Sequence, residues 1–190
     1  MTRRLAVGIF LLAAAVGLGV LQLMIERATV SPLAVANPDG EAGTALVLHH
    51  PGLSDLQLEL TSAFAEALLA ADWRVERTTT SPAAPTDLTD YDLLVLGVHT
   101  YWWAPDGPTR RYLQRVADLN GIRTVALVSA LGAAGRAVRV TEARIRAAGG
   151  EPEAVLPFFV MRPNDETDSR PNHTVALEQA ARAGAAAALR

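Results

Sequence analysis

One short stretch of this sequence gathers the side chains best suited to binding a ligand. An apolar run at residues 93–96 ends at Gly97, as expected for a strand that is buried on both faces. The loop that follows contains a histidine, a threonine and three large aromatic residues: His99, Thr100, Tyr101, Trp102 and Trp103. Aromatic rings on a loop either cover the domain core or form a surface on which a flat ligand stacks. In open parallel sheets, ligands bind beyond the carboxyl ends of the strands, where this loop is expected.

A second candidate binding loop follows the apolar run at residues 44–50. Gly52 permits close approach of the backbone to a ligand, and the Ser54 hydroxyl can donate a hydrogen bond. His50 is either a further donor or one of a pair of histidines satisfied by backbone carbonyl groups. The helix expected next would attract anions through its free N–H groups and its dipole. Pro51 has no N–H to donate, and Asp55 would repel a phosphate group if it faced the site.

The remaining composition narrows the class of protein. The formal net charge is −3, so no basic patch favours nucleic acid. The chain has no cysteine, which excludes disulfides, thiolate catalysis and thiolate metal sites. His49 and His50 are adjacent, and a strand would point them to opposite faces, so no metal site is expected. Ser54 and Ser129 lack the G-x-S-x-G context of a serine nucleophile, and no catalytic residue is predicted.

Strands and helices must alternate to position these loops. Apolar and alternating runs predict strands at residues 44–50, 73–80, 93–96, 122–129 and 155–161, and helical spacing predicts helices at 56–71, 109–119, 136–148 and 175–188. Ser54 and Gln57 have the spacing of a capping box at the start of the first of these helices. The pattern predicts an α/β fold, a three-layer α/β/α sandwich with a five-stranded parallel sheet in the order 2-1-3-4-5.

The N-terminal segment has the length and composition of a transmembrane helix. Residues 5–25 are almost uninterruptedly apolar, which matches the ~20 residues that cross a bilayer, whereas a secretory signal has ~7–15. A cleaved signal is the alternative, because residues 34–36 have the A-x-A form of a cleavage site. Arg3 and Arg4 predict a cytoplasmic N-terminus, whereas Arg27 on the other flank opposes this orientation, so the side of the soluble domain stays open. We therefore expect an anchor at 1–27, a juxtamembrane linker at 28–43 and one domain at 44–190, with membrane lipid as a partner.

The domain resembles the flavodoxin-like family over about residues 45–161. The segment 97–105, GVHTYWWAP, follows the outline of the family's G-S-P-T-Y-x-G-x-x-P after the third strand. Residues 87–92, DLTDYD, are similar to the family's entry to that strand, and 119–126 to its L-x-G-K-x-V-A. The family's first loop has the form S/T-x-T-G-x-T, and most of those hydroxyls are missing at residues 50–55.

The resemblance implies FMN as cofactor, with its phosphate at the first loop and its ring among the aromatic residues of later loops. The implied binding residues are His50, Gly52, Leu53, Ser54, Asp55, His99, Thr100, Tyr101, Trp102, Trp103, Ser129 and Gly132. The function expected is that of a membrane-tethered electron-transfer protein, or a reductase of a small acceptor such as a quinone. The alternative is a flavodoxin-like fold that has lost its flavin and serves as an interaction or scaffold module at the membrane. An acidic cluster at residues 165–168 either is solvated or covers the ligand edge of the sheet.

Overall fold

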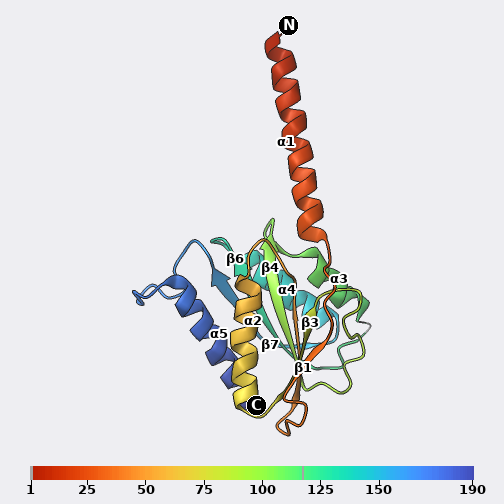
Figure 1. The fold of residues 1–190 in the computed structure, drawn as a ribbon, viewed down its shortest axis with the longest axis vertical. Coiled ribbons are helices and arrows are strands. Elements are labelled where there is room, and N and C mark those ends of the chain that lie inside the picture. Colours follow the sequence, from red (N-terminus) through yellow and green to blue (C-terminus); the bar gives the residue numbers. More distant parts are fainter. Residues whose placement is uncertain (1, 117) are drawn as a thin grey trace.

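A mostly parallel β-sheet forms the centre of the protein, and helices cover both of its faces (Figure 1). The computed structural model describes residues 2–116 and 118–190. The strands are β1 (Ala34–Ala36), β2 (Thr44–His49), β3 (Arg74–Thr79), β4 (Leu93–Tyr101), β5 (Ala104–Pro105), β6 (Arg123–Ala130) and β7 (Glu151–Phe159). The helices are α1 (Thr2–Glu26), α2 (Leu56–Ala70), α3 (Gly107–Arg115), α4 (Gly135–Ala147) and α5 (Asn172–Ala188).

Side-chain alternation along the strands builds two separate cores. Ala45 and Val47 of β2 face α2 and α5, whereas Leu46 and Leu48 face α3 and α4. All four side chains are fully buried, as expected for the central strands of a sheet covered on both faces. The apolar runs that suggested buried strands therefore reflect burial on both sides.

The parallel strands lie side by side in the order β3-β2-β4-β6-β7, and β1 extends the sheet beyond β3. Parallel pairing in register brings His49 beside Gly97, and His99 beside Ser129, at the carboxyl ends of three strands. The loops after β2, β4 and β6 consequently meet at one edge. We call this side of the sheet the carboxyl edge.

The sheet has two strands that the sequence pattern did not predict. β1 pairs antiparallel with β3, and β5 pairs antiparallel with the end of β4. The segment 28–43, expected as a linker, thus contributes a strand, and Ser31 also hydrogen-bonds to Thr78 and Thr79. These contacts hold the segment against the edge of the sheet. The sequence pattern did not indicate the strand, because backbone pairing needs no long apolar run.

Helix α1 projects away from the domain at the carboxyl edge (Figure 1). Residues Leu5–Glu26 are long and apolar enough to cross a membrane, and nearly all of their side chains are exposed. Ile25 is the exception, since it is buried against the domain. The helix is therefore not a core helix, and its last turn is the part that packs on the protein.

Candidate functional site

Two adjoining cavities lie at the carboxyl edge of the sheet. The first, of about 380 Å³, is lined by Thr100, Trp102, Trp103, Ala130, Leu131, Gly132 and Ala133. The second, of about 340 Å³, is lined by Leu53, Ser54, His99, Thr100, Tyr101, Ser129, Ala130, Leu131 and Val160. They share Thr100, Ala130 and Leu131, so we treat them as one cleft between the loops after β4 and β6. Each is within the range of about 300–1,000 Å³ that is typical of small-molecule sites.

One wall of the cleft is a β-hairpin with two tryptophans at its tip. β4 and β5 pair through Tyr101 and Ala104, which leaves Trp102 and Trp103 as the two turn residues. Their φ angles are 53° and 60°, the left-handed values of a type I′ turn, which asparagine and glycine normally occupy. Bulky side chains in this region are uncommon and cost on the order of 1–3 kcal/mol each. Both indoles are nevertheless exposed, at 62% and 59%.

His99 is a buried residue that lines the second cavity of the cleft. Its Nδ1 lies 3.1 Å from the Ser129 Oγ on the neighbouring strand, and the Tyr101 ring stacks on it at 5.7 Å between centroids. Burial lowers the pKa of His99 to about 4, and the nearby His50 adds to this effect. The imidazole is therefore neutral at neutral pH, and a hydroxyl of Ser129 that donates to Nδ1 leaves the ring proton on Nε2.

Two polar atoms in the cleft wall lack a partner within the described part of the chain. They are the His99 Nε2 and the Thr100 Oγ1, and both are buried. Buried polar atoms are nearly always hydrogen-bonded in folded proteins. The Thr100 Oγ1 is consistent with a site where a ligand supplies the missing bond, whereas the His99 Nε2 faces the Gly52 backbone.

The first loop differs from an open phosphate-binding loop because His99 lies over it. A β-carbon at Gly52 would stand only 2.3 Å from the His99 Nε2, so the ring packs directly against the Gly52 backbone. Close approach is possible only because residue 52 has no side chain. A phosphate group approaching Gly52 from this side would meet the imidazole.

His50 takes part in a different contact. Its side chain is buried, and its Nε2 lies 3.1 Å from the backbone oxygen of Ile25 at the end of α1. His50, Gly52 and Asp55 line neither cavity of the cleft, whereas the other nine predicted binding residues do. The pairing of His50 with a backbone carbonyl is the alternative that the sequence left open.

The capping box predicted for Ser54 and Gln57 is wrong. Asp55 is the N-cap of α2, with no side-chain capping bond. Gln57 instead donates from Nε2 to the backbone oxygens of Val98 and Leu127, at 2.6 and 2.9 Å. The Gln57 amide makes these two bonds because its side chain faces the ends of β4 and β6, where backbone carbonyl groups need donors.

Asp106 stabilises the hairpin through hydrogen bonds to its side chain. It was not among the predicted site residues. Its buried carboxylate accepts hydrogen bonds from the backbone N–H of His99 at 2.9 Å, and from the N–H and hydroxyl of Thr109. Burial raises the pKa of Asp106, and the charge of His50 opposes this effect. The signal in the sequence is the spacing of Asp106 and Thr109 around Pro108, which is typical of a helix N-terminus.

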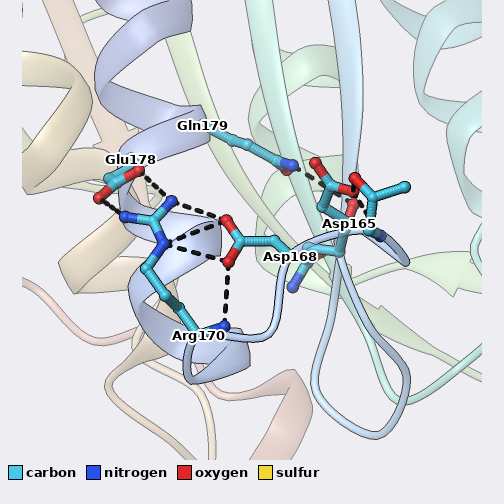
Figure 2. A network of polar contacts seen from close by, with 7 residues as sticks. Asp165, Asp168, Arg170, Glu178 and Gln179 are labelled. Atoms are coloured by element: carbon cyan, nitrogen blue, oxygen red, sulfur yellow. Dashed lines mark hydrogen bonds and ion pairs between the residues drawn. The ribbon is translucent and has the colours of Figure 1, made fainter.

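The carboxylates of the acidic loop after β7 are paired within the protein, chiefly with Arg170 (Figure 2). Arg170 pairs with Asp168 at 2.7 Å and with Glu178 of α5 at 2.5 Å. Hydrogen bonds from Arg170 lower the pKa of Asp168 to about 2, and Asp165 accepts from Thr167 within the loop. These contacts give the cluster a structural role in closing the loop onto α5.

Comparison with solved structures identifies the fold as flavodoxin-like. A flavodoxin from the domain Archaea is 14% identical, with a TM-score of 0.57 over 77% of this chain and 99% of that one. An NAD(P)H:quinone oxidoreductase from Methanothermobacter marburgensis is 17% identical, with a TM-score of 0.55 over 75% and 94%. An azoreductase from Bacillus anthracis is 13% identical, with a TM-score of 0.58 over 76% and 99%. No protein-family model and no curated protein sequence matches the chain.

Proposed function

We propose that this chain is a membrane-tethered flavodoxin-like redox protein that binds FMN in the cleft at the carboxyl edge. The observation that carries the proposal is the cleft itself, because it joins an apolar slot beside exposed indoles to an unpartnered polar atom in the slot wall, the Thr100 Oγ1. The slot fits a flat ring system, which aromatic side chains bind well. The flavodoxin and quinone oxidoreductase folds among the structural neighbours support a flavin.

The residues that would hold the ring are those of the two loops that line the slot: Thr100, Trp102, Trp103, Leu131 and Gly132. Leu53 and Ser54, which line the second cavity, directly precede α2, so a polar tail of the ligand would lie near the N-terminus of that helix. When bound, the flavin supplies the electron-transfer chemistry, and the protein supplies binding and exclusion of water. The acceptor is a protein or a small molecule such as a quinone.

One observation favours a second function, that of a flavin-free interaction module. His99 covers Gly52, and Tyr101 stacks on His99, so the first loop is filled by side chains of the protein itself. The loop also lacks most hydroxyls that would hold a phosphate group. In this alternative the cleft residues stabilise a surface for another molecule.

FMN titration separates the two functions. We expect the purified protein to show flavin absorption in the visible range, or to take up FMN with micromolar or tighter affinity when the cofactor is added. Trp102→Ala and Trp103→Ala should weaken binding, because aromatic pairs contribute ~0.5–1.5 kcal/mol beyond their buried area. Leu189→Ala, at the exposed C-terminus, is the control and should leave affinity unchanged. A protein that binds no FMN at millimolar concentration would overturn the flavin proposal and favour the alternative.

The tether itself is tested by fractionation. We expect the protein to stay in the membrane fraction after carbonate washing. Pairing of β1 with β3 supports an uncleaved anchor, because cleavage after Ala36 would remove β1 from the sheet. Recovery of a soluble product beginning near Asn37 would exclude the anchor.

A further inference from the structure

Large apolar side chains are exposed on all four loops that follow β2, β4, β6 and β7. The loops expose Leu53, Trp102, Trp103, Leu131, Val160 and Met161, each at more than half of its full accessibility. We call these six residues the apolar rim, since five of them line the cleft and Met161 follows Val160 directly in the chain. Exposed apolar patches of this kind are typical of surfaces that bind a membrane or another molecule.

The opposite edge of the sheet has a different character. The loops there expose Asp72, Asp90, Asp118 and Asn120. A cluster of exposed large apolar side chains is therefore found at the carboxyl edge, whereas Leu189 at the end of α5 is exposed singly.

Helix α1 leaves the domain at the same edge as the apolar rim, and its last turn is fixed there (Figure 1). The carboxylate of Glu26 pairs with Arg110 at 3.1 Å and with Arg111 at 2.9 Å, at the start of α3. A carboxylate at a helix N-terminus is also favoured by the helix dipole. The His50 ring adds its contact with the Ile25 backbone oxygen. These bonds set the direction in which α1 extends from the sheet edge.

The indole of Trp102 lies level with the end of the apolar span. Its Nε1 donates to the Gln22 Oε1 at 3.0 Å. The 22 residues Leu5–Glu26 extend over about 33 Å at ~1.5 Å per residue, slightly more than the ~30 Å thickness of a bilayer's hydrocarbon core. The boundary of that core therefore falls in the last turns of α1, near Gln22. Tryptophan is enriched at this depth because its ring is apolar and its N–H is polar.

We propose that the apolar rim docks into the interface of the same bilayer that α1 crosses, so that the cleft opens onto lipid. The occupant of the rim is the lipid surface itself. Continuity of the rim with the span, and the bond between Trp102 and Gln22, carry this assignment. The strained turn at Trp102 and Trp103 presents both indoles outward, where lipid covers them. The proposal rests on membrane anchoring by α1 as proposed above, and it implies that an acceptor dissolved in the bilayer reaches the cleft without crossing water.

The test uses the full-length protein in phosphatidylcholine vesicles that contain lipids brominated near the headgroup end of the acyl chains. The chain has three tryptophans, and Trp73 is buried near the opposite edge. We expect the brominated lipid to quench tryptophan fluorescence strongly in the wild type. The double variant Trp102→Phe, Trp103→Phe retains only Trp73, and its emission should not be quenched.

A pair of matched variants probes the rim without changing the tryptophans. Leu131 belongs to the rim, whereas Leu189 is exposed at the other end of the molecule. Leu131→Asp should reduce quenching by roughly half, because a carboxylate is disfavoured at the hydrocarbon boundary. Leu189→Asp should leave quenching unchanged.

Vesicle flotation separates this proposal from the anchor. Protein that does not float with the vesicles shows that α1 does not anchor the chain. Protein that floats while its fluorescence is quenched by aqueous iodide and not by the brominated lipid overturns the docking and leaves the anchor in place. In protein without bound flavin, indoles shielded from both quenchers would show that a second copy or another protein covers the rim, and would equally overturn it.

Discussion

The imidazole of His99 lies against the backbone of Gly52, with only 2.3 Å between Nε2 and the position a β-carbon would take. Gly52→Ala must therefore displace the ring or the loop, and overpacking of this kind costs about 1–3 kcal/mol. Gly132→Ala is the matched control, because a β-carbon there meets no heavy atom within 4 Å. Urea unfolding of the two variants should show a loss of stability for the first only. Equal stability of both would mean that the ring moves away without cost.

Stability should fall as the pH is lowered from about 6.5 towards 4. Burial lowers the folded-state pKa of His99 and of His49 to about 4, from an unfolded value of 6.5. Between these values the unfolded chain binds protons that the folded chain does not, so stability is lost as the pH falls through this window. The contribution of His99 is on the order of 3 kcal/mol.

The variant His99→Asn isolates the share that belongs to His99. Its amide can replace the Nδ1 contact with the Ser129 hydroxyl and does not titrate. Denaturation midpoints measured between pH 4 and 7 should therefore depend less steeply on pH in this variant. An unchanged slope would assign the acid sensitivity to other groups.

Asp106→Ala should destabilise the protein by about 2–4 kcal/mol. It removes the N-cap of α3 and leaves the buried N–H groups of His99 and Thr109 without an acceptor. Asp87→Ala is the comparison, since Asp87 accepts hydrogen bonds from Thr89 alone among the described residues, in an exposed turn. Thermal unfolding should show a large shift for the first variant and little change for the second.

The fold was predictable because its information is local. The apolar runs at residues 44–50 and 122–129 are buried strands. The helix predicted at 109–119 is shorter than expected, because it ends at Arg115, and Asn120 with Gly121 forms a turn before β6 and not a helix C-cap. The short strands β1 and β5 were not predictable, because two or three residues that pair through the backbone leave no periodic pattern in the side chains.

The site was predictable in its loops and less so in its contacts. The pattern indicated that His99, Ser129 and the aromatic loop would meet at the carboxyl edge, and parallel register brings them there. The packing of His99 on Gly52 and the contact of His50 with α1 depend on long-range geometry. Residue spacing in the sequence does not indicate which distant side chain packs against a glycine such as Gly52.

Relief of strain at the hairpin tip should stabilise the fold and impair the site. The double variant Trp102→Asn, Trp103→Gly places the residues preferred by a type I′ turn at φ angles of 53° and 60°. Because both indoles are exposed, little packing is lost, and we expect a gain of about 1 kcal/mol in unfolding free energy. FMN titration of the same variant should show weaker binding, since the slot loses its aromatic wall. The control Trp102→Phe, Trp103→Phe keeps aromatic rings and the strain, and should show neither the gain in stability nor the full loss of affinity. A double variant with Asn and Gly that is less stable than the wild type would show that the indoles stabilise the hairpin.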